Sequence, residues 1–328
     1  MKTWHRALPA PDAAQDAPRI AGGPVRFTKV ERLTRGHPPE VIDAADLDAG
    51  TFARLTAPRP DIAGIRMDRP RIMGIVNVTP DSFSDGGRFL AAADAATQIA
   101  AMDAAAILDI GGESTRPGAA EVEAAAEIAR VLPVIAGVTD RVMSIDTRKA
   151  PVARAAVEAG AAIVNDVSAG TFDPAMLATV ADLGVPICLM HAQGLPETMQ
   201  NDPTYEDVLF DVLDALAARI AAAEAAGIPR ARIIADPGIG FGKTQAHNLA
   251  LLRRIGVFHD LGVPILLGAS RKRFIGDIGQ APQADARLPG TLAVTLAAVA
   301  QGVQIHRVHD VAEIAQGLAL WQAVTGGR

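Results

Sequence analysis

A short sequence unit that recurs eight times constrains the fold of this chain more than any other feature. In each unit a run of aliphatic residues ends in a polar residue, and a turn rich in Gly, Pro or Asp leads into an Ala-rich segment with apolar residues at helical spacing. The aliphatic runs are residues 71–78, 105–112, 141–147, 161–167, 185–191, 231–238, 263–270 and 303–310. They are almost continuously apolar, as the strands of a parallel sheet buried on both faces are. We therefore predict an α/β fold, a (β/α)8 TIM barrel with an N-terminal extension, because the alternative of a doubly wound open sheet would not require eight equivalent units.

Two of the predicted helices have recognisable ends. The segment 172–184 offers Asp173 as an N-cap and Pro174 at the first helical position, and it closes on Gly184. The segment 211–227 closes on Gly227 in the same way. We expect both segments to form helices on the outside of the barrel.

The residues before the barrel divide into two parts. Residues 1–20 are rich in Ala, Pro and Asp without periodicity, which predicts a flexible leader. Residues 21–70 contain a strand-like run at 25–34 and a short helical pattern at 43–56. We expect residues 21–70 to form an extension packed on the barrel, and residues 71–328 to form a single catalytic (β/α)8 domain.

Composition and charge exclude several classes of protein. With 49% hydrophobic and only 4% aromatic residues, the chain can bury a large core made mostly of Ala, Val, Ile and Leu. A net charge of −6 offers no basic field for nucleic acid or an anionic membrane. Cys188, the single cysteine, lies in an apolar run and cannot form an intrachain disulfide. The chain carries no signal-peptide-like or membrane-spanning stretch, so we expect a cytoplasmic protein without a membrane partner.

The residues that close the aliphatic runs are the most informative, because (β/α)8 barrels place their active sites at the carboxyl ends of the strands. These residues are Asn77, Asp109, Asp146, Asn165, Asp166, His191, Asp236, Ser270 with Arg271 and Lys272, and Arg307 with His309. A single acidic residue there is commonly a helix cap or a turn former. Asp109, Asp146 and Asp236 occupy the same place in the repeat, which favours a shared pocket. Such a pocket suits a flat nitrogen-rich ring such as an aminopyrimidine, although paired acids could instead hold a metal or act as general acid and base.

Basic residues follow the last two runs. Loops after strands seven and eight of these barrels often bind phosphate, and Arg and Lys are natural partners of phosphate oxygens. Ser270, Arg271, Lys272, Arg307 and His309 therefore predict an anion site.

Three Gly-containing loops complete the predicted site. Residues 77–87 place Phe83 among small and polar residues, residues 111–119 contain Ser114, Thr115 and Arg116, and residues 236–243 set Phe241 between glycines. Glycine permits hinge motion or close approach of the backbone to a ligand. Neither the loop at 111–119 nor the loop at 236–243 has the spacing of a P-loop or a dinucleotide-binding fingerprint.

Taken together, these strings resemble the dihydropteroate synthase family of folate biosynthesis. The matching strings, in the order of the family, are MGIVNVTPDSFSDGG, LDIGGESTRPGA, SIDTRK, IVNDVSAG, LMHAQGLPETMQ, DPGIGFGKT, GASRKRFIG and RVHDV. They extend from Arg71 to about Val311. The resemblance implies a transferase that condenses 6-hydroxymethyl-7,8-dihydropterin pyrophosphate with 4-aminobenzoate by an SN1-like substitution, with Mg²⁺ assisting. It also implies a sulfonamide target and a homodimer.

The resemblance also implies roles for individual residues. The pterin pocket would consist of Asp109, Asp146, Asn165, Met190, Asp236 and Lys272. The pyrophosphate site would consist of Asn77, Arg116, Arg307 and His309, with Mg²⁺ near Asn77. The aminobenzoate site would consist of Phe83, Thr115, Pro117, Phe241, Ser270 and Lys272, with Phe83 on a mobile lid. Catalysis would depend on Asn77, Arg116, Lys272, Arg307 and His309.

Two positions depart from the pattern of the family, and two other functions remain open. Ala192 stands where Met is frequent, and Arg273 stands where some members have Ser. One alternative is a methyltetrahydrofolate-dependent methyltransferase with a corrinoid partner, which would not need both the GGESTRPG loop and the basic sector. The other is a non-catalytic paralogue that only binds pterin.

Overall fold

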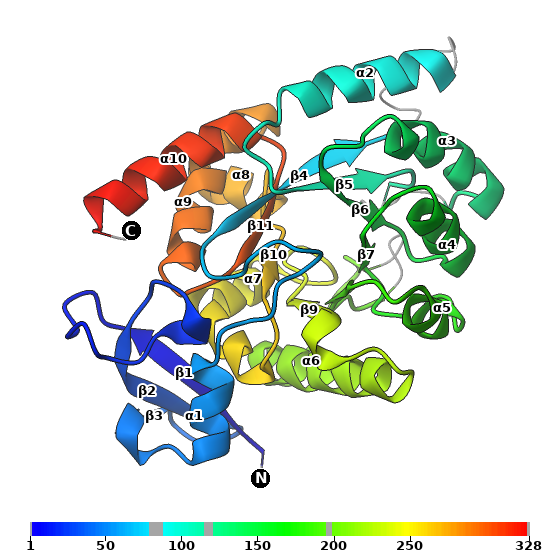
Figure 1. Ribbon diagram of the computed structural model, residues 1–328. Helices are drawn as coiled ribbons and strands as arrows, with labels where there is room; N and C mark the ends of the chain where they lie inside the picture. The colour runs from blue at the N-terminus through cyan, green and yellow to red at the C-terminus, as the bar shows by residue number, and fades with distance from the viewer. Residues whose placement is uncertain (1, 79–87, 115–120, 195–198, 327–328) are drawn as a thin grey trace.

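The computed structural model describes residues 2–78, 88–114, 121–194 and 199–326, with the backbone alone for residues 88–93. It contains a parallel barrel surrounded by helices, and a small N-terminal sheet lies beside the barrel (Figure 1). Within the described residues no helix is long and apolar enough to cross a membrane.

Eight parallel strands form the barrel, and each falls within one of the eight predicted runs. They are β4 (Arg71–Asn77), β5 (Ile107–Gly111), β6 (Val142–Asp146), β7 (Ile163–Asp166), β8 (Ile187–Met190), β9 (Ile233–Asp236), β10 (Leu266–Leu267) and β11 (Ile305–Val308). The sheet runs from β10 through β11 and β4 to β9. A parallel bridge between Ala235 and Ile265 brings β9 beside the start of β10 and closes the ring. The (β/α)8 prediction is confirmed.

Helices follow the strands and lie outside them (Figure 1). They are α2 (Arg88–Ala100), α3 (Ala124–Ala136), α4 (Ala150–Glu158), α5 (Met176–Leu183), α6 (Val208–Ala225), α7 (Gln245–Arg253), α8 (Arg273–Gly279), α9 (Leu288–Val299) and α10 (Val311–Val324). A 3-10 helix, η5 (Ile255–Leu261), follows α7.

One predicted helix start is wrong. α5 begins at Met176 rather than at Pro174, and Asp173 does not cap it. The Asp173 carboxylate instead accepts hydrogen bonds from the backbone N–H of Ala150 at 2.8 Å and of Ala175 at 2.9 Å. Ala150 opens α4, so Asp173 satisfies an unpaired donor of a neighbouring helix. The predicted end at Gly184 is confirmed, with φ at 68° in the left-handed region.

Side chains alternate along the strands, and this alternation separates an apolar barrel floor from the polar end above it. The floor cluster contains Met73, Ile107, Ile163, Cys188, Ile234, Leu266 and Ile305, and Ile62 and Met67 pack against these residues. Cys188 is fully buried here, and burial raises the pKa of its thiol. The next inward positions, two residues further along each strand, include Asp109, Asn165, Met190, Asp236 and Arg307.

The prediction of a flexible leader is wrong for residues 3–9. They form β1 (Thr3–Pro9), which pairs antiparallel with β2 (Phe27–Thr34), and β3 (Glu40–Asp43) completes a three-stranded sheet. The Ala- and Pro-rich composition concealed this strand, whose Trp4 and Ala7 are buried. Helix α1 (Ala49–Thr56) follows, capped by the Asp48 side chain.

Two buried carboxylates join this N-terminal sheet to the barrel. Glu31 on β2 accepts hydrogen bonds from Arg6 on β1 and from Arg254, which lies between α7 and η5. Asp260 on η5 accepts from the His5 backbone at 2.9 Å and from Arg54 Nε at 2.7 Å. Both carboxylates are less than one-tenth exposed, so salt screens these contacts little.

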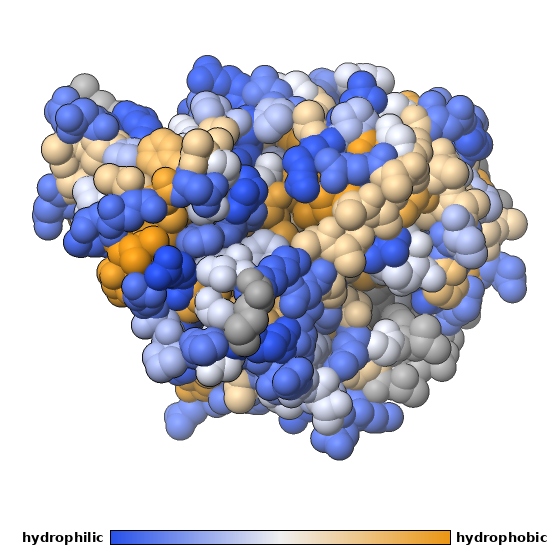
Figure 2. Space-filling model, turned by 90° about the horizontal axis from the view of Figure 1, so that it is seen from below, coloured by the Kyte–Doolittle hydropathy of each residue, from blue (hydrophilic) through white to orange (hydrophobic). Residues whose placement is uncertain are grey.

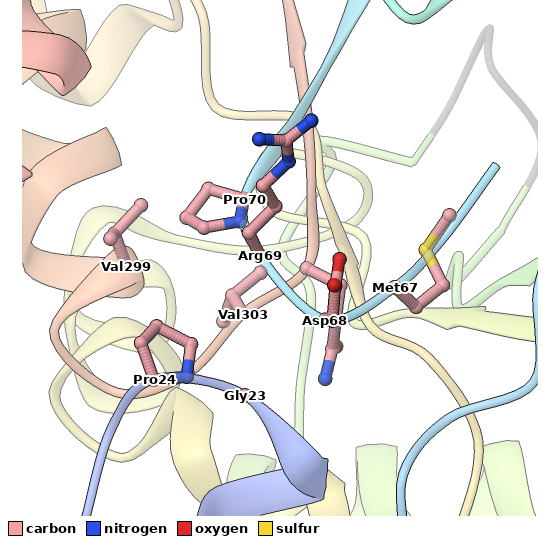
Figure 3. A pocket seen from close by; sticks show the side chains of 10 residues that line it. Gly23, Pro24, Met67, Asp68, Arg69, Pro70, Val299 and Val303 are labelled. Carbon is pink, nitrogen blue, oxygen red and sulfur yellow. The ribbon is translucent and has the colours of Figure 1, made fainter. Parts of the chain in front are cut away.

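The surface of the molecule mixes hydrophilic and apolar regions. Seen from below, hydrophilic residues predominate, with apolar patches between them (Figure 2). A small pocket lies between the extension and the amino-terminal ends of β4 and β11, away from the polar end of the barrel (Figure 3). Its lining is mostly Gly, Pro and Val, with Asp68 and Arg69 as the charged members.

We predict that Asp260→Ala lowers the free energy of unfolding by about 2–3 kcal/mol, because it removes hydrogen bonds made by a buried charged group. Urea denaturation measures this loss. The matched control is Asp43→Ala, which removes the exposed pair between Asp43 and Lys29 and should cost less than about 0.5 kcal/mol. Equal losses in the two variants would contradict a special role for the Asp260 contacts.

Candidate active site

A polar pocket opens at the carboxyl end of the barrel, where the sequence predicts the site. It is lined by Asp146, Asn165, Val167, Met190, Asp236, Gly238, Phe241, Gly268, Lys272 and Arg307. Five of the six residues predicted to bind a pterin ring therefore line one pocket. The sixth, Asp109, is fully buried and contacts the pocket through Arg307.

Arg307 joins two acidic residues of the predicted ring-binding set. Its Nε donates to Asp109 Oδ2 at 2.6 Å, and its Nη2 donates to Asp146 Oδ2 at 2.7 Å. Asn165 Nδ2 donates to the same Asp109 oxygen at 2.9 Å. The resemblance implied a pyrophosphate contact for Arg307. In the structure its guanidinium pairs with two carboxylates of the ring pocket and also lines that pocket, so the role toward pyrophosphate stays a prediction.

The second oxygens of these carboxylates, Asp109 Oδ1 and Asp146 Oδ1, are buried without a hydrogen-bond partner among the described residues. Buried polar atoms are nearly always hydrogen-bonded, so each is a ready acceptor for an N–H donor. Burial raises the pKa of Asp146, against the opposing effect of the Arg307 charge. Burial also raises the pKa of Asp236 to about 6, while the Gly238 N–H that donates to it opposes the shift.

Phe241 and Lys272 form one side of the pocket. Lys272 Nζ lies 4.1 Å from the centre of the Phe241 ring, which is a cation–π contact. The two residues come from the loops after β9 and β10. The resemblance implied that both contact aminobenzoate, and the structure brings them together at the pocket.

Ser270 and His309 lie beside each other at the ends of the last two strands. Ser270 Oγ is 3.0 Å from His309 Nδ1 and accepts from the His309 backbone N–H at 3.2 Å. Arg271, which the sequence grouped with them, forms a two-bond ion pair with Asp310 instead. Its charge therefore ties two loops together and is not directed at the pocket. Arg273 is 91% exposed beside Asp277 and does not line the pocket.

The remaining predicted residues divide into two groups. Asn77 ends β4 on the inward side and is half-buried. Phe83, Thr115, Arg116 and Pro117 lie outside the described residues, so their predicted roles stay predictions.

Sequence reasoning missed several residues that hold the site. Lys243 is buried behind the pocket wall and hydrogen-bonds to His191. Glu113 accepts from the Val122 N–H and pairs with the buried Arg148 and Lys149, which joins the two described ends of the loop after β5. Both residues belong to the quoted strings, but only their place in the strings could have drawn attention to them.

Comparison with known proteins agrees with this geometry. Residues 73–309 match the family model described as pterin binding enzyme. The dihydropteroate synthase of Escherichia coli strain K12 is 43% identical over 80% of this chain and 94% of its own length. The dihydropteroate synthase of Neisseria meningitidis serogroup B is 48% identical over 79% of this chain and 94% of its own length. The fold, the pocket and the family model together place this chain in the class of pterin-binding (β/α)8 enzymes.

Solved structures narrow the class further. Xanthomonas albilineans dihydropteroate synthase with 4-aminobenzoic acid superposes with a TM-score of 0.75 at 47% identity, covering 81% of this chain and 98% of that one. The same enzyme in complex with 7,8-dihydropteroate gives a TM-score of 0.71 at 44% identity, over the same shares of the two chains. The chain belongs to the dihydropteroate synthase family, whose members are transferases.

We predict that Asp236→Asn stabilises the free protein at about pH 8 by about 3 kcal/mol, because burial raises the pKa from 3.8 to about 6 and each unit costs about 1.4 kcal/mol once the group is ionised. The folded state binds this proton more tightly than the unfolded state does. Stability of the wild type therefore falls as the pH rises from about 4 to about 6, and the advantage of the variant should vanish near pH 4.

Urea denaturation at several pH values measures this difference. Asp140→Asn, at a carboxylate that is 81% exposed, serves as the control and should change stability little at any of these pH values. A variant at Asp236 that is less stable than the wild type at pH 8 would contradict the burial argument.

Proposed function

We propose that this site joins 6-hydroxymethyl-7,8-dihydropterin pyrophosphate to 4-aminobenzoate, giving 7,8-dihydropteroate and pyrophosphate as a step of folate biosynthesis. The observation that carries this proposal is the arrangement of Asp146, Asn165 and Asp236 around one pocket, with Lys272 and Phe241 at its side. The acids suit the N–H donors of a pterin ring, and the cation and aromatic ring suit an aromatic carboxylate.

Ring binding would use acceptors that the free protein leaves available. Asp236, the Asn165 amide and the second oxygen of Asp146 would accept from or donate to the edge of the pterin. Asp109 would act from below, by fixing Arg307 and Asn165 through its Oδ2. Met190 lines the pocket and offers a polarisable apolar contact for the face of the ring.

Charge stabilisation would carry the chemistry. In an SN1-like substitution the bond to pyrophosphate breaks first, so negative charge grows on the leaving group while a cation forms next to the ring. We propose that Arg307, His309 and Arg116 stabilise the leaving group, and that Asp146 and Asp236 stabilise the cation. A neutral arylamine then attacks without a strong general base. Lys272 would hold the 4-aminobenzoate carboxylate, while Phe241 and Ser270 line its place together with Phe83, Thr115 and Pro117.

A direct test follows pyrophosphate release with both substrates. Release that requires 4-aminobenzoate supports the synthase. Pterin binding without turnover would support a binding-only paralogue, and methyl transfer from methyltetrahydrofolate would support the methyltransferase. Inhibition by a sulfonamide drug would agree with the proposal, because Yersinia pestis dihydropteroate synthase has been solved in a complex with such a drug.

We predict that Arg307→Lys lowers kcat by about 10²–10³-fold. Lysine keeps one positive charge but cannot bond two carboxylates with a planar fork, and a preorganised donor of this kind contributes on the order of 3–4 kcal/mol. Steady-state kinetics measures the effect. Arg273→Ala, one residue past Lys272 and exposed, is the control and should keep normal turnover. A wild-type kcat in Arg307→Lys would reject the assigned role.

Magnesium is the proposed cofactor. Asn77 offers an inward amide oxygen, and Mg²⁺ commonly binds through one or two protein oxygens together with substrate phosphates. The described residues contain no group of three His, Cys, Asp or Glu able to hold a metal ion, so the pyrophosphate oxygens would supply most ligands. Bound there, Mg²⁺ would neutralise charge on the leaving group.

We therefore predict that EDTA reduces turnover by at least about tenfold, since charge on the leaving group loses one of its stabilising partners, and that added Mg²⁺ restores it. Binding of a pterin without pyrophosphate, measured by calorimetry, should not respond to EDTA. Turnover that persists unchanged in EDTA would remove the metal from the proposal.

A cytoplasmic homodimer completes the proposal. Ile278 on α8 and Leu320 and Val324 on α10 are more than half exposed, which supports an apolar contact between the outer helices of two copies. The buried free thiol of Cys188 suits a reducing compartment.

A further inference from the structure

Lys243 lies directly behind the pocket wall with only 3% of its surface exposed. Its Nζ contacts the carbonyl oxygens of Gly238 at 2.9 Å, Phe241 at 3.0 Å and His191 at 3.2 Å. It also lies 2.9 Å from His191 Nδ1, which accepts because an ammonium group can only donate. Within the described residues no carboxylate forms an ion pair with it. The buried charge is thus satisfied by carbonyl and imidazole acceptors of two loops.

These two loops touch backbone to backbone. Gly238 and Gly242 have φ values of +66° and +60°, in the region that favours glycine. A Cβ at Gly238 would lie 1.8 Å from the His191 carbonyl oxygen, and one at Gly242 would lie 2.4 Å from the Gln193 carbonyl oxygen. A side chain at either glycine would collide with the other loop, and the Lys243 ammonium bonds to carbonyl oxygens of both loops from within the turn.

The same turn carries Phe241 to the pocket. The Phe241 carbonyl faces Lys243, while its ring packs under the Lys272 ammonium at 4.1 Å. Lys243 itself does not line the pocket. The hydrogen bonds of Lys243 therefore reach the pocket through Phe241 and Gly238, and its charge also acts on Asp236.

Other side chains hold the outer half of this turn. Tyr205 donates its hydroxyl to the Gly242 carbonyl at 2.7 Å, and Gln200 donates to the Gly240 carbonyl at 2.6 Å. The buried Asn248 accepts from the Gly240 N–H at 2.7 Å. Because these contacts do not involve Lys243, loss of its ammonium should release the inner half of the turn without unfolding the loop.

We propose that Lys243 is a positioning residue for the aminobenzoate part of the site, which it serves by fixing the turn that presents the Phe241 ring to Lys272. This inference rests on the proposed function, in which those two residues bind 4-aminobenzoate. Lys243 reaches the predicted pterin residues at one point, Gly238, whose N–H donates to Asp236. Asp146 and Asn165 are held by Arg307 and Asp109 instead, so the pterin pocket depends less on Lys243.

The experiment replaces Lys243 by Met, which keeps the length of the side chain but removes the charge and the hydrogen bonds. Calorimetry measures the Kd of 4-aminobenzoate with pterin and pyrophosphate present, and separately the Kd of the pterin. We expect Lys243→Met to weaken 4-aminobenzoate binding by about tenfold or more, because the Phe241 turn loses the charged hydrogen bond that fixes it. Pterin affinity should stay within about threefold of the wild type.

Arg59→Met is the matched control. Like Lys243, Arg59 is a buried cation with no carboxylate ion pair among the described residues. It donates to the backbone carbonyls of Ala57, Arg54 and His259, and it lies in the extension. The Arg59→Met variant should lose stability without weakening 4-aminobenzoate binding.

If Lys243→Met does not fold, Gly242→Ala tests the same inference. Its Cβ would push the same turn away from Gln193 while every buried charge stays in place. It should show the same selective loss.

Each outcome is decisive. Unchanged 4-aminobenzoate binding in folded Lys243→Met, or equal losses of pterin and 4-aminobenzoate affinity, overturns the positioning role. A selective loss in Arg59→Met as well would make the effect one of general stability and overturns it too. Because binding is measured directly, a wild type that binds both molecules without releasing pyrophosphate rejects the proposed function and still leaves this inference open to the same measurement.

Discussion

The alternation of side chains along parallel strands is the constraint on which the site depends. In a closed barrel every second residue points inward, so the apolar floor determines which residues stand above it. Ile107, Ile163 and Ile234 belong to that floor, and Asp109, Asn165 and Asp236 follow two positions later. A one-residue shift in any strand would turn its polar residue toward the helices. The strand register that packs the apolar core therefore also brings the polar residues of the pocket together.

The pocket maintains charges that a stable core would avoid. Three carboxylates are less than one-tenth exposed, and Arg307 bridges two of them, Asp109 and Asp146. Removal of ionised groups from water is costly unless each has a partner, and here the pairing is incomplete on the ligand side. The chain tolerates this cost because a large aliphatic core surrounds it. The same unpaired oxygens are acceptors that would suit the N–H donors of the proposed pterin ring.

The sequence allowed prediction of the features that neighbouring residues determine, namely the strands and the polar residues at their ends. Continuous aliphatic runs revealed the strands, and their last residues revealed Asp146 and Asp236. The strand at residues 3–9 was missed because its stability comes from pairing with β2, not from its own composition. The bond between Arg307 and Asp109 joins residues 198 positions apart, which no local pattern encodes. A lysine normally indicates a solvated surface, so Lys243 gave no signal of its burial.

The long-range anchoring of the N-terminal sheet has a consequence for biosynthesis. His5 bonds with Asp260, 255 positions later, and Arg254 reaches back to Glu31 across 223 positions. At about 5–20 residues per second, the ribosome needs on the order of 10–50 s to supply these partners. During that time β1 and β2 can pair with each other but have no barrel to pack on. Strand β4 likewise waits for its neighbour β11. The N-terminal sheet is thus synthesised before the barrel residues to which it bonds, and in the interval only its own small core can stabilise it.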